Sequence, residues 1–288
     1  MQTFFDLILK GGINVARKIV ITSGKGGVGK TTVTANLGYA LADLGFRVVL
    51  LDVDFGLNNL DVVMGLENKV VFDLRDVFDN RCRVKQALIQ DKNRKNLYIL
   101  PSGRLETSSN VSGQNIKLLL ESINSLFDFI LIDCPAGIDI GFHRAVSCCD
   151  EAIVVATPSL SSLRDADKVI SILKSYRIES INMIINRARG DLILNQKMMY
   201  PNDIKSLLNT DIIGVLPEED IVFLSSGGRI PKKTDSYKSY KMLASNIVNG
   251  SNKVFDVTNK YKGFIGSIKR SLRNLWVQKT KRLLELIH

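Results

Sequence analysis

The chain has 288 residues, of which 45% are hydrophobic and 24% charged, and its formal net charge is +10. This composition provides enough apolar residues for one central sheet and excludes an intrinsically disordered chain. No stretch approaches the roughly 18 uncharged apolar residues that a membrane-spanning helix requires.

Short apolar runs alternate with helical patterns along most of the chain. Strands are predicted at residues 18–23, 47–51, 96–100, 129–132, 152–156, 181–185 and 211–215, and helices at 30–44, 114–126 and 162–176. Alternation of this kind predicts an α/β fold with a doubly wound, mostly parallel sheet and helices on both faces. Ligands of such sheets bind at the carboxyl ends of the strands. Polar residues that follow the predicted strands, such as Asp52, Asp133 and Asn186, are therefore candidate site residues.

Three regions are expected from these patterns. Residues 1–17 are predicted to be a short extension, because they lack the basic start and long apolar stretch of a secretory signal. Residues 18–250 would form the α/β domain. The composition shifts near residue 250, so residues 251–288 are interpreted as a linker and a basic amphipathic tail.

A glycine-rich segment between the first strand and the first helix matches the phosphate-loop pattern G-x-x-x-x-G-K-[ST]. It reads Gly24-Lys25-Gly26-Gly27-Val28-Gly29-Lys30-Thr31-Thr32. Its backbone N–H groups and the start of the helix would surround phosphates. Lys30 is expected to reach the β- and γ-phosphates, and the Thr31 hydroxyl to ligate Mg²⁺.

The same glycines also fit the dinucleotide-binding pattern of dehydrogenases. Gly24, Gly26 and Gly29 match G-x-G-x-x-G, and Asp52 ends the next predicted strand. A dehydrogenase turn has no use for a fixed lysine and hydroxyl directly after the last glycine. Lys30 and Thr31 therefore favour a nucleoside triphosphatase.

The phosphate loop resembles that of the MinD/ParA ATPases, whose distinguishing residue is an additional lysine, here Lys25. Further motifs at residues 52–61, 64–65, 87–89, 96–101, 133–138 and 161–167 resemble the MinD branch of this family. The similarity covers roughly residues 18–272. It implies an Mg²⁺-dependent ATPase in which Lys30 and a Lys25 from the partner subunit bind the phosphates, so that ATP holds a homodimer together.

The resemblance also assigns roles to single residues. Asp54 would position the attacking water, Asp52 and Asp133 would support the Mg²⁺ ion, and Asn59 would lie near the γ-phosphate. An aspartate at a strand end can instead be only a helix cap or turn former. The neighbouring phosphate loop favours the functional reading.

Three further positions are carried over from the family. Asn186 and Pro217 would face the adenine, although Asn186 could also be a simple turn residue. Asp165 matches a position linked to partner binding, but it lies near the start of a predicted helix and could merely complement the helix dipole.

The tail concentrates basic charge and apolar residues. Residues 260–288 carry eight Lys or Arg and one Glu, which gives +7 (8 − 1) of the net +10. The apolar residues share one helical stripe: Phe264, Ile265, Ile268, Leu272, Leu275 and Trp276. A basic amphipathic helix with aromatic residues suits an anionic membrane surface. An ordinary helix packed on the domain is the alternative.

The expected function is spatial control of division by an ATP-dependent, membrane-associating ATPase with inhibitor and activator partners of the MinC/MinE type. The protein would act at the plastid inner envelope, which it would reach from the stroma and which we favour, or at a bacterial inner membrane. A ParA-type DNA partition ATPase is the alternative, against which the nearly neutral body of the chain argues. A second alternative is a scaffold protein that binds nucleotide without hydrolysing it and so holds an assembly together. A metal carrier would need a cysteine cluster, which the four cysteines (Cys82, Cys134, Cys148 and Cys149) do not form.

Overall fold

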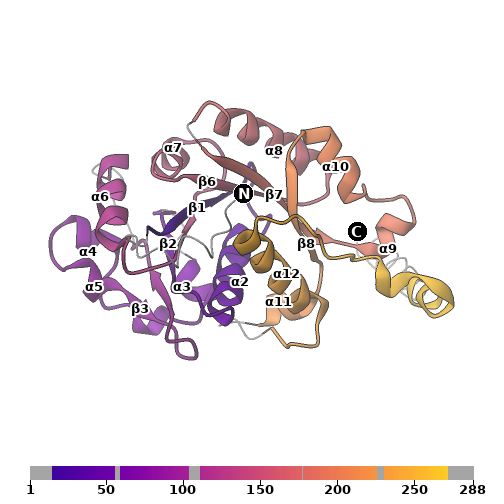
Figure 1. Ribbon diagram of the computed structural model, residues 1–288, viewed down its shortest axis with the longest axis horizontal. Coiled ribbons are helices and arrows are strands. Elements are labelled where there is room, and N and C mark those ends of the chain that lie inside the picture. The colour runs from indigo at the N-terminus through magenta and orange to yellow at the C-terminus, as the bar shows by residue number, and fades with distance from the viewer. Residues whose placement is uncertain (1–14, 56–58, 104–110, 177, 226–229, 272–288) are drawn as a thin grey trace, which may run out of the picture.

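The computed structural model describes residues 15–55, 59–103, 111–176, 178–225 and 230–271. Within them, eight strands form one sheet in the order β3-β4-β2-β5-β1-β6-β7-β8. All neighbouring strands run parallel except β3 and β4. Figure 1 shows the sheet in the middle of the molecule with helices on both sides. The predicted doubly wound, mostly parallel α/β fold is confirmed.

The strands lie close to the predicted apolar runs. Their bounds are β1 Arg17–Thr22, β2 Val48–Asp52, β3 Ile89–Gln90, β4 Leu97–Leu100, β5 Phe129–Asp133, β6 Glu151–Ala156, β7 Ser180–Ala188 and β8 Asp211–Pro217. β2 and β5 are buried along their whole length, as expected for parallel strands that are covered on both faces. The sequence did not predict β3, which has only two residues and pairs antiparallel with β4 at the sheet edge.

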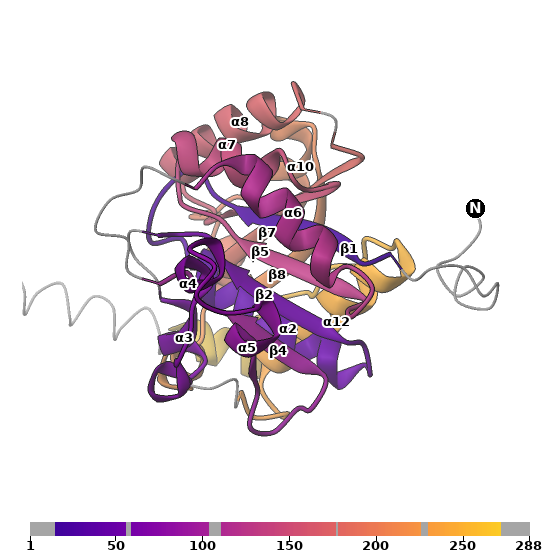
Figure 2. The same cartoon turned by 90° about the vertical axis from the view of Figure 1, so that its left-hand side faces the viewer.

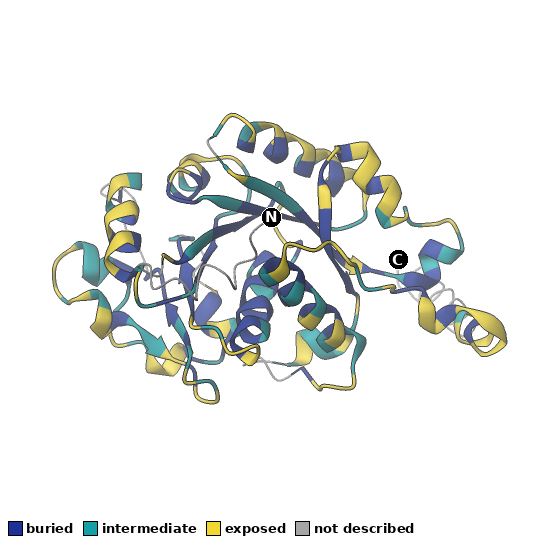
Figure 3. Ribbon diagram, in the orientation of Figure 1, coloured by how far each residue is buried: buried dark blue, intermediate teal, exposed yellow. Residues whose placement is uncertain are grey.

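Two hydrophobic layers cover the sheet, one on each face (Figure 2). One layer contains α6 (Gly113–Ile123), α7 (Ile140–Val146), α8 (Leu160–Leu173) and α10 (Pro201–Leu208). The other contains α2 (Lys30–Asp43), α3 (Leu60–Val63) and α12 (Asp235–Asn249). Figure 3 shows buried residues along the sheet and exposed residues on the outward sides of the helices.

Short elements connect these layers. They are α4 (Leu74–Phe78), α5 (Val84–Ala87), α9 (Gly190–Leu194), α11 (Asp220–Leu224) and the 3₁₀ helices η1 (Glu67–Lys69) and η2 (Asn259–Tyr261). Local chemistry fixes several helix starts. The side chains of Ser159 and Thr234 accept hydrogen bonds from the first turns of α8 and α12. These bonds satisfy backbone N–H groups that otherwise lack partners.

The C-terminal segment folds onto the domain beyond α12. That helix ends at Gly250 in the left-handed conformation (φ 65°), and the side chains of Val257 and Tyr261 are buried farther along. Residues 263–271 are helical, whereas Leu272, Leu275 and Trp276 lie outside the described residues. Among the described residues, no helix is long and apolar enough to cross a membrane. The boundary placed near residue 250 stays a prediction.

Candidate nucleotide-binding site

The phosphate loop lies where the sequence placed it, between the carboxyl end of β1 and the first turn of α2. Gly27 and Gly29 adopt positive φ angles of 76° and 91°, which favour glycine. Lys25 is exposed, whereas Lys30 is only 8% exposed. The two lysines therefore differ in their surroundings, because Lys25 lies in solvent and Lys30 lies within the site.

The loop is held between two elements that are distant in sequence. A Cβ atom at Gly24 would overlap the backbone carbonyl of Asp165 in α8. A Cβ atom at Gly29 would lie 2.5 Å from Nδ2 of Asn186, which donates a hydrogen bond to the Val28 carbonyl at 2.8 Å. Close approach of the Asp165 backbone thus requires glycine at position 24, whereas at position 29 the positive φ adds to the contact with the Asn186 side chain.

Two aspartates end the adjacent strands β2 and β5, and Asp52 and Asp133 are direct neighbours in the register. Each is 1% exposed. The Lys30 ammonium lies 2.9 Å from Oδ1 of Asp133, and the Thr34 hydroxyl donates to the same oxygen at 3.2 Å. The structure therefore brings Lys30, Asp52 and Asp133 together. Thr34 was not predicted, although it lies one helical turn after Lys30 and so faces the same side.

Burial and mutual repulsion disturb the ionisation of this aspartate pair. Burial, with the neighbouring Asp133 carboxylate as the second cause, raises the pKa of Asp52 to about 8. Burial also raises the pKa of Asp133, against the charge of Lys30 and hydrogen bonds from Thr31 and Thr34. A divalent cation would relieve the repulsion, because it stabilises the ionised form of both acids. Two carboxylates beside a threonine hydroxyl are the hard oxygen donors that suit Mg²⁺.

The two remaining predicted phosphate-side residues lie on the segment after β2. Asp54 is half-buried, and its backbone N–H donates to Oδ1 of Asp52 at 2.9 Å. Asn59 is exposed and immediately precedes α3, where its carbonyl accepts a hydrogen bond from Val63. Asp52 also accepts from the Leu60 backbone at 3.4 Å, so it ties both ends of this segment to the site.

A cavity of about 250 Å³ adjoins the loop on the side away from the aspartates. Its lining includes Gly29, Thr32, Asn186 and Pro217, which the sequence had assigned to nucleotide binding. The lining also includes Glu219, two residues after Pro217, to which the family resemblance assigned no role. This cavity continues from the phosphate loop and is the candidate base pocket.

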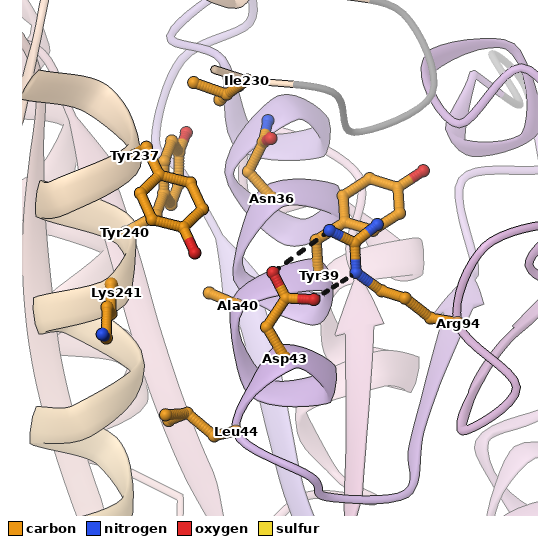
Figure 4. Close-up of a pocket in the computed structure, with 10 residues that line it drawn as sticks. All are labelled: Asn36, Tyr39, Ala40, Asp43, Leu44, Arg94, Ile230, Tyr237, Tyr240 and Lys241. Carbon is orange, nitrogen blue, oxygen red and sulfur yellow. Dashed lines mark hydrogen bonds and ion pairs between the residues drawn. The ribbon is translucent and has the colours of Figure 1, made fainter. Parts of the chain in front are cut away.

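A second cavity of about 140 Å³ lies between α2 and α12 (Figure 4). Arg94 crosses one side of it and forms a two-pronged ion pair with Asp43, at 2.6 and 3.1 Å. Tyr237 and Tyr240 of α12 face α2 from the other side. None of the phosphate-loop residues lines it, so it is separate from the candidate phosphate site.

The predicted partner residue lies on α8, whose backbone contacts the phosphate loop at Gly24, and the predicted membrane residues lie on the tail helix. The Asp165 side chain is half-buried on α8 and lies 3.6 Å from the Lys168 ammonium. On the tail helix, Phe264, Ile265 and Ile268 are 83%, 69% and 47% exposed. Gly266 is buried on the opposite side. The described residues of the apolar stripe, Phe264, Ile265 and Ile268, therefore face outward rather than into the domain.

Comparisons with known proteins agree on one family. A family model described as an AAA domain matches residues 16–186. The chain is 47% identical over 230 residues to a putative septum site-determining protein MinD of Guillardia theta, covering 80% of this chain and 86% of the relative.

Two solved structures are similar along most of their length. The MinC:MinD cell division protein complex of Aquifex aeolicus contains a chain with a TM-score of 0.76 and 39% identity, covering 83% of this chain and 98% of that one. The septum site-determining protein MinD of Pyrococcus horikoshii, complexed with Mg-ADP, has a TM-score of 0.71 and 31% identity, with coverages of 81% and 96%. The chain therefore belongs to the MinD family of septum site-determining ATPases.

Proposed function

We propose that this chain binds Mg²⁺ and ATP, hydrolyses the ATP, and uses the nucleotide to control its attachment to an anionic membrane during placement of the division site. The observation that carries the proposal is the convergence of Lys30, Asp52 and Asp133 at one edge of the sheet, beside the phosphate loop. The relative that was solved with Mg-ADP supports the choice of ligand.

The residues that would hold the ligands follow from the geometry. Thr31 and the aspartate pair Asp52 and Asp133 would hold Mg²⁺, whose charge offsets that of the phosphates when bound. Lys30 would move from Asp133 to the β- and γ-phosphates. Asp54 would orient the attacking water for in-line displacement at the γ-phosphate, and Asn59 would close over that side. Asn186 and Pro217 would contact the adenine.

The exposed position of Lys25 suits a homodimer. Its side chain is not held within the site of its own subunit, so it is available to the phosphates of a partner subunit. Lys25 would then stabilise negative charge in the transition state. ATP would join two subunits and so place two tail helices on one membrane. The second helix binds at a high effective concentration, which converts weak single contacts into stable attachment.

A division inhibitor of the MinC type is the proposed partner, with a MinE-type protein as activator. The support is the solved Aquifex aeolicus MinC:MinD complex and the position of Asp165 on α8, directly against the phosphate loop. We place the protein on the plastid inner envelope, in line with its algal relative, and a bacterial inner membrane is the alternative.

Co-sedimentation with anionic vesicles tests the nucleotide switch. The wild type is expected to sediment with ATP and to stay largely in solution with ADP or without nucleotide, because only ATP would pair the two tails. Lys30→Ala should remain in solution throughout. Binding that does not depend on nucleotide would contradict the switch, and ATP-dependent binding to duplex DNA in place of vesicles would favour a partition ATPase.

The tail is tested separately by Phe264→Glu, which places a charge on the most exposed of the three stripe residues that the structure describes. Loss of vesicle binding is expected with ATP hydrolysis in solution retained, because Phe264 neither belongs to the phosphate loop nor lines the candidate base pocket. Phe264→Leu is the matched control and should keep binding. Equal sedimentation of the two variants would show that this stripe is not the anchor.

A further inference from the structure

The start of the tail helix is joined to the base pocket by an ion-pair cluster. The Lys260 ammonium lies 2.9 Å from Oδ2 of Asp235 and 3.4 Å from Oε1 of Glu219. Lys260 belongs to η2 and lies three residues before Gly263, where the helical segment 263–271 begins, whereas Asp235 is the first residue of α12. One side chain therefore connects three parts of the chain that are distant in sequence.

Glu219 connects this cluster to the base pocket. It lines the candidate base pocket two residues after Pro217. Its Oε2 accepts hydrogen bonds from the backbone N–H and the hydroxyl of Ser236, at 2.8 and 2.7 Å. The loop that borders the base is thus fixed to the start of α12 and, through Lys260, to the tail. A shift of this loop would move or break the Lys260 pairs.

The chain is packed closely against the domain where it enters the tail helix. Tyr261 is 5% exposed, and a Cβ atom at Gly266 would overlap the Tyr261 backbone. Val257 is buried, and its carbonyl lies so close to Gly190 of α9 that a Cβ atom there would overlap it. The first turn of the tail helix is therefore mounted on the domain, beside α9 (Figure 1), rather than tethered by a free linker.

Packing also connects α12 to the helix that follows the phosphate loop. α12 packs along α2, the helix that carries Lys30 and Thr31, and Figure 4 shows the two helices face to face. Tyr240 of α12 lines both the base pocket and the cavity between the helices. A nucleotide that orders the phosphate loop and the base loop would consequently also fix the position of Asp235.

We propose that Lys260 is a positioning residue that couples the nucleotide pocket to the membrane helix within a single subunit, through its pairs with Glu219 and Asp235. This inference rests on the proposed nucleotide and membrane binding, and it adds to the effect of dimer formation. A bound nucleotide orders the base loop, which holds Lys260 and orients the start of the tail helix. Because the tail helix is then already ordered, vesicle binding costs less conformational entropy, and the affinity for the vesicle rises.

The coupling is measured under conditions that exclude the ATP dimer. ADP lacks the γ-phosphate that would join two subunits, so any effect of Mg-ADP on vesicle affinity arises within one subunit. Trp276 is the only tryptophan of the chain and lies on the tail, so its emission reports vesicle binding directly. The full-length protein is titrated with vesicles of equal parts phosphatidylcholine and phosphatidylglycerol, with and without saturating Mg-ADP.

We expect Mg-ADP to raise the vesicle affinity of the wild type about fivefold, a typical size for coupling between sites. Lys260→Met should bind vesicles equally well with and without Mg-ADP, whereas Lys260→Arg should keep the fivefold difference. Lys262→Met is the matched control, because it removes the same charge from a lysine whose partner, Asp256, lies outside the base pocket. By linkage, vesicles should raise the affinity for fluorescent ADP by the same factor, and only where Lys260 or Arg is present.

The outcomes separate this inference from the proposed function. Vesicle binding with the same affinity with and without Mg-ADP in the wild type overturns the coupling and leaves membrane binding intact. An unchanged ratio in Lys260→Met also overturns it. A complete absence of vesicle binding in every nucleotide state overturns the membrane function itself, and the coupling with it.

Discussion

The aspartate pair at the ends of β2 and β5 shows how a functional demand works against stability. Two carboxyl groups side by side in a parallel sheet, each almost fully buried, cannot both ionise readily. Lys30 offsets part of this charge through Asp133. Asp52 has no such partner among the described residues and accepts only backbone hydrogen bonds. The two carboxylates therefore destabilise the fold when no cation is present, and a bound cation would stabilise them.

This arrangement predicts how stability depends on pH. The pKa of Asp52 is raised to about 8 in the folded protein from an ordinary value of 3.8. Between these values the folded state retains a proton that the unfolded state has lost, so stability must fall as the pH rises through this window. In Asp52→Asn this loss is absent. At pH 8, without nucleotide or Mg²⁺, we expect the variant to be more stable by on the order of 1 to 3 kcal/mol.

Urea unfolding at pH 5 and pH 8 measures the difference. The two proteins should be similar at pH 5 and separate at pH 8. Asp167→Asn on the exposed side of α8 controls for the loss of a carboxylate and should follow the wild type. Parallel pH profiles for the wild type and Asp52→Asn would show that Asp52 is not protonated in the fold.

At the scale of elements, the phosphate loop is fixed by contacts from α8 and β7 as well as by its own glycines. Gly24 lies against the backbone of Asp165, which cannot move aside as a flexible side chain could. At Gly26, two residues later, an added methyl group would meet no heavy atom within 4 Å, and φ is not positive. The two glycines therefore provide a matched pair of substitutions.

Gly24→Ala should destabilise the nucleotide-free protein by about 1 to 3 kcal/mol, because an added methyl group in a close-packed site forces a backbone shift. It should also weaken binding of fluorescent ADP, since the loop is displaced from α8. For Gly26→Ala the free energy of unfolding should lie within about 1 kcal/mol of the wild-type value, since the added methyl group meets no neighbour. Thermal unfolding followed by circular dichroism compares them, and equal midpoints would refute the close contact with α8.

The same contacts mark the limit of what the sequence could predict. Apolar runs in a regular alternation predicted seven of the strands, and the glycine–lysine–threonine pattern predicted the phosphate loop, because both depend on local chemistry. β3 was missed, since two residues carry no periodicity. The contacts Gly24–Asp165 and Lys260–Glu219 join residues far apart in sequence, so only the fold reveals them.

At the scale of the whole molecule, the proposed homodimer would share each reaction between two subunits. The domain holds Lys30 inside its own site and leaves Lys25 exposed. The exposed apolar residues Phe264, Ile265 and Ile268 would likewise bind the proposed membrane best when two tails face it together. Both features fit the proposed ATP-bound dimer, in which each subunit would complete the site of the other.

A mixing experiment decides whether Lys25 acts across the dimer. Lys25→Ala keeps its own Lys30 and Asp54 but lacks the lysine that it would donate. Asp54→Ala keeps Lys25 but lacks the carboxylate that is proposed to orient the water. Each variant alone should be inactive. In a mixed dimer the Lys25→Ala subunit would receive Lys25 from its partner, so one complete site forms, and random pairing should restore about a quarter of the wild-type rate. ATP hydrolysis measured over a range of mixing ratios should peak at equal amounts. A mixture that stays inactive, while cross-linking shows that mixed dimers form, would place Lys25 in the site of its own subunit.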